Sequence, residues 1–137
     1  MTQEAPPKPL PLPDDESKPF FEGAAEGKLM LMRCKECGAP RLPSRQHCDE
    51  CLSSDYEWFA ASGRGTVRTF AIMHQRYHPA FAAELPYNVA VVELEEGPRL
   101  PANIVGISNA ELRVGLPVVV EWERHEDVTI PRFRPAG

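Results

Sequence analysis

The 137-residue chain lacks any apolar run that approaches the roughly 20 residues of a membrane-spanning helix. Its first seven residues, Met1 to Pro7, also lack the basic and apolar regions of a secretory signal peptide. We therefore expect a cytoplasmic protein with reduced cysteines and no membrane partner. At this length we expect one compact domain, or two small ones with a tail.

Positive charge is also scarce, since 15 lysines and arginines face 20 aspartates and glutamates and the formal net charge is −5. Proteins that bind nucleic acids gain much of their affinity from several Lys or Arg contacts to phosphates. An acidic chain is a poor match for such a ligand, so we expect no nucleic-acid partner.

Motifs of catalysis are missing as well. The sequence contains no Gly-x-Ser-x-Gly nucleophile elbow, no phosphate-binding glycine loop and no His-Glu-x-x-His motif of metallohydrolases. The histidines form no recognisable arrangement with a nucleophile. We therefore predict no catalytic residues.

What the sequence does contain is two Cys-x-x-Cys pairs, Cys34 with Cys37 and Cys48 with Cys51. A two-residue spacer lets a tight turn direct both thiolates at one ion, and a second such turn completes a tetrahedron. The alternatives are disulfides, which need an oxidising compartment, and a redox dithiol, which needs only one pair. We predict one structural Zn²⁺ per chain, because four thiolates leave no coordination position open for catalysis.

The first 19 residues form a proline-rich segment. Prolines stand at positions 6, 7, 9, 11, 13 and 19. Proline at this density prevents helix and sheet formation and favours an extended polyproline conformation. The composition predicts a flexible arm over 1–19, and an arm that wraps a partner is the alternative.

Residues 20–54 have the pattern of a helical segment followed by a zinc ribbon. Phe20–Gly27 is typical of a short helix that two glycines weaken. Leu29–Met32 predicts a strand that leads into the first cysteine pair, and Arg41–Pro43 predicts the returning strand. Gly38 directly follows the first pair, where a positive φ is commonly required.

Residues 55–137 change to a β pattern, rich in β-branched and aromatic residues. Ser62–Gly65 predicts a bulge or tight bend. The predicted strands are Tyr56–Ala61, Thr66–Gln75, Tyr87–Leu94, Arg99–Val105, Val118–His125 and Val128–Phe133. Several short strands with glycine bends favour a small barrel, so the fold class is mainly β with a C-terminal OB-fold.

Motifs in this order resemble one known family. It joins an N-terminal helical segment, a rubredoxin-like zinc ribbon and a C-terminal OB-fold, and it accompanies thiolase-type and other acyl-CoA enzymes. The resemblance covers residues 18 to 134. The matching stretches are Phe20–Gly23, Leu29–Gly38, Pro43–Cys51, Trp58, Ser62–Val67, Pro86–Tyr87, Gly115–Val118 and Pro131–Phe133. The family often carries tryptophan where Phe21 stands, a departure that keeps an aromatic side chain.

The resemblance implies a non-catalytic accessory subunit. Such a chain would bind a thiolase-like or other acyl-CoA enzyme in a hetero-oligomer and help to handle the coenzyme A thioester. It implies that the OB-fold packs on the partner and on the coenzyme rather than on nucleic acid.

The long connection His74–Tyr87 is the most informative stretch for such contacts, because loops of this length in small barrels are often functional. Coenzyme A requires cations for its phosphates and an apolar slot. The candidates for binding the coenzyme or the partner are Arg64, Arg68, Arg76, Tyr77 and Phe81. Equally, the loop could plug the barrel and the arginines could be ordinary surface residues.

Two alternatives come from other functional classes. A nucleic-acid-binding ribbon and OB-fold would use aromatic platforms such as Phe70 and Trp122, but Glu93, Glu95, Glu121 and Glu123 crowd the same strands. A free-standing enzyme is the other alternative, and the sequence supplies no residues for it.

Overall fold

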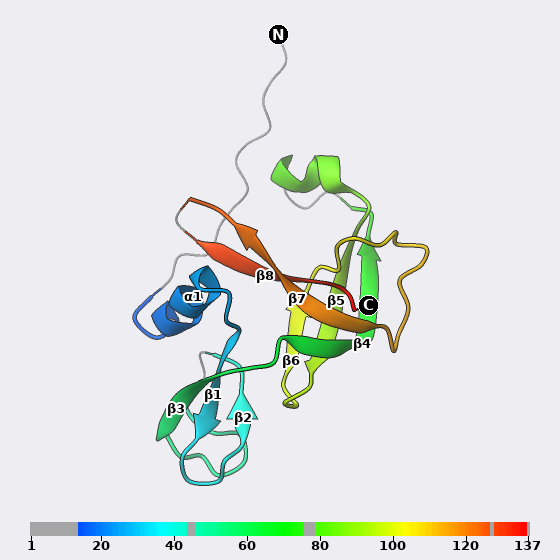
Figure 1. Ribbon diagram of the computed structural model, residues 1–137. Coiled ribbons are helices and arrows are strands. Elements are labelled where there is room, and N and C mark those ends of the chain that lie inside the picture. Colours follow the sequence, from blue (N-terminus) through cyan, green and yellow to red (C-terminus); the bar gives the residue numbers. More distant parts are fainter. Residues whose placement is uncertain (1–13, 44–45, 76–78, 127, 137) are drawn as a thin grey trace.

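A computed structural model describes residues 14–43, 46–75, 79–126 and 128–136. Figure 1 shows a small sheet at one end of the molecule and a larger coiled sheet, with helical segments beside them. The elements are α1 (Lys18–Ala25), β1 (Met30–Cys34), β2 (Pro40–Arg41), β3 (Tyr56–Ala60), β4 (Arg64–Met73), the 3₁₀ helix η1 (Pro79–Glu84), β5 (Tyr87–Leu94), β6 (Arg99–Ala102), β7 (Pro117–Arg124) and β8 (Thr129–Pro135). None of the described helices has the length and apolar character needed to cross a membrane.

Helix α1 begins two residues earlier than the sequence predicts. Pro19 lies in its first turn, where the missing N–H costs no hydrogen bond. The preceding turn is held by Asp14, whose carboxylate accepts a hydrogen bond from the Ser17 N–H at 2.8 Å. Lys18 and Pro19, which fall within the arm predicted over 1–19, thus belong to the helix, and residues 1–13 lie outside the described part of the chain.

The end of α1 packs closely on the first strand. A Cβ at Gly23 would lie 2.3 Å from Cγ of Met30, so glycine is needed for this approach. The helix stops where Gly27 adopts a φ of 78°, and the Lys28 N–H returns to the Gly23 carbonyl at 2.8 Å. Arg124 of β7 donates to the Ala25 carbonyl at 3.0 Å, which ties the helix to the larger sheet.

The ribbon contains a three-stranded antiparallel sheet in the order β2-β1-β3. Strand β3 pairs with β1 along its whole length, from Met30 opposite Ala60 to Cys34 opposite Tyr56. The sequence predicts β3 as a strand correctly, but its hydrogen bonds go to the ribbon and not to the barrel strands. Leu31 of β1 is fully buried and belongs to the same apolar cluster as the barrel core.

The larger sheet has the strand order β6-β5-β4-β7-β8. A parallel bridge between Ile104, after β6, and Phe133 of β8 brings its two edges together. With the five strands numbered along the chain, the order around the barrel is 1-2-3-5-4-1, which is the OB-fold. The predicted fold class is thereby confirmed.

Strand β4 pairs with two neighbours. Residues Arg64 to Thr66 pair with β7 and residues Gly65 to Met73 pair with β5, and the register with β5 shifts between Val67 and Thr69. A Cβ at Gly65 would come within 2.6 Å of the Glu93 carbonyl oxygen, so the backbones of β4 and β5 approach too closely there for a side chain. The bend predicted within Ser62–Gly65 lies at Gly63, which directly precedes β4 and has a φ of 81°.

One apolar core serves both sheets. Leu29 and Leu31 from the ribbon pack with buried barrel residues, among them Val67, Val92 and Phe133. Phe133 is fully buried and is the largest of these side chains. The ribbon is therefore anchored to the barrel through its first strand and not through a free linker.

Candidate functional site

The four cysteines come together as the sequence predicts. All four Sγ atoms lie within 4.8 Å of one another. Two pairs are closest, Cys34 with Cys51 and Cys37 with Cys48, each at 3.5 Å. For metal–sulfur bonds of about 2.3 Å, a tetrahedral ion separates its sulfurs by roughly 3.8 Å. The described residues therefore hold a donor set that fits one tetrahedral metal ion.

Each cysteine pair sits on the same kind of turn. The Gly38 N–H bonds to the Cys34 carbonyl, and the Leu52 N–H bonds to the Cys48 carbonyl, both at 2.9 Å. Both Gly38 and Leu52 have positive φ, of 77° and 65°. Glycine adopts this conformation without strain, whereas leucine does so at a cost. The sequence indicated the first turn through Gly38 but gave no such signal at Leu52.

Backbone N–H groups favour the charged form of the two buried sulfurs. The N–H groups of Cys37 and Glu36 lower the pKa of the Cys34 thiol to about 6. The N–H groups of Cys51 and Glu50 likewise lower the pKa of the Cys48 thiol. The pKa of Cys37 rises to about 12, because hydrogen bonding with neighbouring thiols outweighs the lowering effect of the Ala39 N–H. The backbone thus favours the thiolate form at both sulfurs, and thiolate is the form that binds metal.

A cavity of about 810 Å³ lies between β5, the segment after β6 and the β7–β8 hairpin. OB-folds bind ligands on the face of their second and third strands, between the loop after strand 1 and the loop before strand 5. Those loops here are 74–86 and 125–128. The cavity is lined by Glu84, Pro86, Tyr87, Asn88, Val89, Pro101, Ala102, Asn103, Ile104, Val105, Asn109, Glu121, Trp122, Glu123, Ile130, Pro131 and Arg132.

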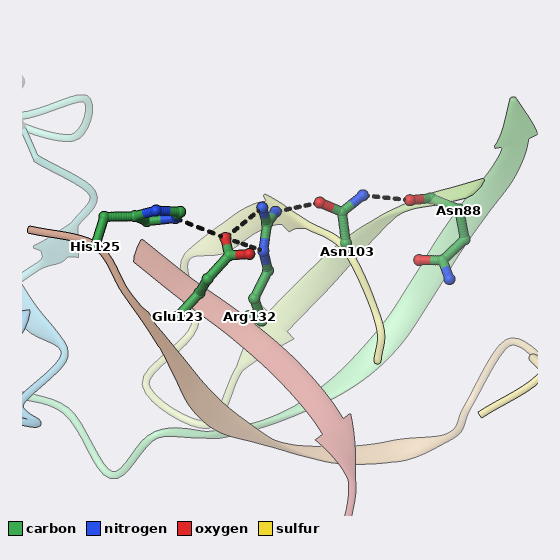
Figure 2. A network of polar contacts seen from close by, with 5 residues as sticks. All are labelled: Asn88, Asn103, Glu123, His125 and Arg132. Atoms are coloured by element: carbon green, nitrogen blue, oxygen red, sulfur yellow. Dashed lines mark hydrogen bonds and ion pairs between the residues drawn. The ribbon is translucent and has the colours of Figure 1, made fainter. Parts of the chain in front are cut away.

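Figure 2 shows a network of five polar side chains, of which all except His125 line this cavity. Arg132 donates twice to Oε2 of Glu123, from Nε at 3.1 Å and from Nη2 at 2.7 Å. Nε2 of His125 lies 3.4 Å from the same carboxylate oxygen. Arg132 also donates to the Asn103 side-chain oxygen, and Asn103 donates to the Asn88 carbonyl. The network thereby connects β8 and β7 with β5.

Asn88 is the buried end of this network, with 6 % of its surface exposed. Its amide nitrogen donates to the Ile104 carbonyl at 2.9 Å, and its oxygen accepts from the Ile104 N–H at 2.7 Å. These bonds hold Ile104 where it bridges Phe133 of β8. The side chains of Asn88, Asn103 and Arg132 therefore supplement backbone pairing where the barrel closes.

The pH dependence of folding stability tests the contribution of Glu123 to this network. Burial raises the pKa of its carboxyl, but Arg132 and then His125 lower it more, so the net pKa falls below its ordinary value. A lowered pKa in the folded state means that the carboxylate stabilises the protein above the unfolded pKa of about 4.3, and that this contribution is lost as the pH falls further.

We expect Glu123→Gln to lower the free energy of unfolding at neutral pH. The difference from wild type should shrink as the pH falls through about 4, because the wild-type carboxyl is then protonated as well. Urea unfolding at several pH values measures this, and Glu126→Gln, a change at an exposed carboxylate nearby, is the control. A difference from wild type that stays constant with pH would contradict the role of the Glu123 charge.

The predicted coenzyme or partner contacts lie apart from this cavity, as far as the structure describes them. Nε of Arg64 pairs with Glu95 at 3.1 Å and Nε of Arg68 with Glu93 at 3.3 Å, and both arginines are exposed on β4. Neither lines the cavity. Arg76 and Tyr77 lie outside the described residues. Phe81 falls in η1, and its side chain is not among those described.

Sequence reasoning missed most of the polar lining of the cavity. Asn88 and Asn103 lie in none of the stretches that resemble the family, and Arg132 lies in one of them, Pro131–Phe133, without a role assigned to it. Asn88 did leave one signal, because it is a polar residue at an inward position of an otherwise apolar strand. An amide there requires partners, and such a position is a candidate for a structural or functional network.

Two family models match consecutive stretches of the chain. The model described as the rubredoxin-like zinc ribbon domain of ChsH2 covers residues 21–57. The model described as the C-terminal OB-fold domain of ChsH2 covers residues 58–123. Together they span the ribbon and most of the barrel, and their common border falls within β3.

Characterised relatives support this match. The chain is 40 % identical over 130 residues to a probable enoyl-CoA hydratase alpha subunit of Thermomonospora curvata, a match that covers 94 % of this chain and 40 % of that protein. It is 34 % identical over 97 residues to a DUF35 domain-containing scaffold protein of Methanocaldococcus jannaschii, covering 70 % of this chain and 68 % of the relative. The chain thus spans well under half the length of the Thermomonospora subunit.

A solved structure shares both the sequence and the fold. A chain of the Ltp2-ChsH2(DUF35) aldolase superposes with a TM-score of 0.82 at 39 % identity, over 93 % of this chain and 100 % of that chain. The ribbon and the barrel are thus found together in a known structure. The chain belongs to the DUF35 family, whose ChsH2-type members join a rubredoxin-like zinc ribbon to a C-terminal OB-fold.

Proposed function

We propose that this chain is a non-catalytic, zinc-containing subunit of a thiolase-like acyl-CoA enzyme complex in the cytoplasm. The observation that supports it most is the likeness to a chain of the Ltp2-ChsH2(DUF35) aldolase over nearly the whole length. A hydratase alpha subunit and a scaffold protein among the relatives support the same role. The chain would hold its partner in an active arrangement and assist with the coenzyme A thioester.

The metal in this proposal is one Zn²⁺, held by Cys34, Cys37, Cys48 and Cys51. Four thiolate donors are typical of structural zinc, and they leave no position for a substrate or a water molecule. The ion would stabilise the folded ribbon. The cysteine sulfurs are thereby unavailable as nucleophiles, which favours a partner that carries the chemistry.

The polar groups of the cavity do not form an acid–base pair facing open space. The carboxylate of Glu123 accepts from Arg132 and His125, and Arg132 is further engaged by Asn103. A residue used for proton transfer must reach the substrate, whereas these side chains contact one another. The described residues therefore favour a binding or structural role for this face.

Coenzyme A phosphates would bind outside the cavity, on β4 and the loop after it. Arg64 and Arg68 are exposed there, and their pairs with Glu95 and Glu93 are surface ion pairs that contribute about 0–1 kcal/mol each. A phosphate could replace such a partner at little cost. Arg76, Tyr77 and Phe81 in the following loop would complete this contact. A nucleic acid is the alternative ligand, but the carboxylates along these strands disfavour it.

We expect the purified chain to hydrolyse or condense no acyl-CoA thioester, and to raise the activity of the partner with which it co-purifies. The measurement is thioester turnover by the chain, by the partner and by the complex.

Tyr77→Ala with Phe81→Ala should lower assembly or activity of the complex without changing the melting temperature of the chain.

Arg64→Ala with Arg68→Ala should raise the KM of the complex for the thioester, and Arg113→Ala, at an exposed arginine outside β4, is the control. Steady turnover by the chain alone would refute the accessory role. Salt-sensitive binding of nucleic acid in place of a protein partner would favour the alternative function.

A further inference from the structure

The cavity on the OB-fold face has an acidic and ring-rich lining. Three carboxylates line it, those of Glu84, Glu121 and Glu123, against the single guanidinium of Arg132. Arg132 is already bound by Glu123 at 2.7 Å, so its charge is compensated within the lining. Tyr87, Trp122 and three prolines, Pro86, Pro101 and Pro131, are among the remaining lining residues.

This lining selects for a particular class of ligand. Excess carboxylate repels phosphates and favours a cationic or neutral group. Aromatic and proline rings provide flat apolar surfaces, on which proline-rich segments dock in the polyproline conformation. A volume of about 810 Å³ is large enough for several side chains of an extended peptide.

The chain itself contains a segment with these properties. Residues 6–13 read Pro-Pro-Lys-Pro-Leu-Pro-Leu-Pro, with Lys8 as their only charged residue. The positive charge of Lys8 complements the carboxylates of the cavity, and the prolines and leucines of the segment complement its apolar surface. The entropy lost on binding is small for such a segment, because proline already restricts its backbone.

The position of α1 places this segment within reach of the cavity. Arg124, which bonds to the last turn of α1, directly follows Glu123 of the lining. The eight residues of α1 span about 12 Å, so its first turn lies roughly that far from Arg124. Eight residues in the polyproline conformation extend about 25 Å, which exceeds this distance. Figure 1 shows α1 beside the β7–β8 hairpin that forms one wall of the cavity.

We propose that residues 6–13 of the same chain bind in the cavity on the OB-fold face, with Lys8 directed at its carboxylates and the prolines and leucines against Tyr87 and Trp122. The proline-rich segment is then an internal ligand of the barrel. Any other ligand of this face has to displace it. The inference goes beyond the proposed function, because it does not depend on which enzyme is the partner.

The test uses the full-length chain and a capped synthetic peptide of residues 6–13. Changing Lys8→Glu, Leu10→Ser and Leu12→Ser together should release the internal segment. NMR spectra should then show a shift of the Trp122 indole signal and no shift of the Trp58 indole signal, since Trp58 lies in β3, away from the cavity. The peptide should bind this triple variant at least about tenfold more tightly than it binds wild type, where the tethered segment competes at an effective concentration near millimolar.

Two matched changes in the triple variant locate the binding site. Trp122→Leu should weaken peptide binding about tenfold or more, and Trp58→Leu should leave it unchanged, with cooperative unfolding of both variants as the check on folding. A peptide that carries Lys8→Glu should bind more weakly than the natural one. Equal affinity for the triple variant and wild type, or an unchanged Trp122 signal, would overturn the proposal. So would spectral changes that depend on protein concentration, which would assign the segment to a second copy.

Discussion

Replacing Cys37 by serine is expected to abolish metal binding and to unfold the ribbon together with part of the barrel. Structural zinc in small domains contributes about 10–16 kcal/mol, which matches or exceeds the total stability of about 5–15 kcal/mol of an ordinary domain. The loss of structure should extend from the ribbon into the barrel. Cys34 ends β1, and the same strand carries Leu31 into the barrel core.

Metal analysis should give one zinc ion per wild-type chain and well under one for Cys37→Ser. Circular dichroism should show a lower melting temperature and a smaller β signal, and a chelator added to wild type should reproduce both changes. Glu36→Ser, an exposed change inside the same turn, is the matched control and should retain zinc. Full zinc occupancy with an unchanged melting temperature in Cys37→Ser would refute the four-cysteine site.

Asn88→Ala is expected to lower the free energy of unfolding by about 2–4 kcal/mol, because buried hydrogen bonds are lost and their partners remain unsatisfied. The backbone N–H and carbonyl of Ile104 would both lose the Asn88 side chain. Ile104 in turn forms the bridge to Phe133 that closes the barrel. The loss should therefore appear as faster amide exchange around Ile104 and β8 as well as in global stability.

Urea unfolding and hydrogen exchange measure the two effects. Asn109→Ala is the matched control, since Asn109 contributes one longer bond of 3.3 Å to Asn88 and one of 3.0 Å to the Pro86 carbonyl. It should cost about 1 kcal/mol or less. If both variants were equally stable, or if exchange at β8 were unchanged in Asn88→Ala, the amide network would not be what closes the barrel.

The parts of the fold that depend on local patterns could be predicted from the sequence. The cysteine spacing placed four sulfurs in one cluster, because each pair needs only a tight turn. The β-branched strand Tyr87–Leu94 was predicted with its observed bounds. The start of α1 was placed too late, because proline was taken as a helix breaker although it fits the first turn.

The parts of the fold and of the site that depend on long-range pairing could not be predicted from the sequence. The order of elements does not reveal that β3 pairs with β1 across the whole metal-binding segment. Likewise, Arg64 and Arg68 meet Glu95 and Glu93 because β4 lies beside β5, a contact that spacing along the chain does not encode. The cavity is lined by residues from five separate stretches, 84–89, 101–105, 109, 121–123 and 130–132, which only the folded chain brings together.

The pairing of β3 has a consequence for how such chains can be recombined. The border between the two matched family models, at residues 57 and 58, falls in the middle of β3. A chimera joined there would combine half of a strand from each parent and would also divide the core that Leu29 and Leu31 share with the barrel. Exchange of whole modules between relatives should therefore succeed when the crossover lies within Ser62–Gly63, after β3 has ended, and when the donor barrel offers the same apolar surface to β1.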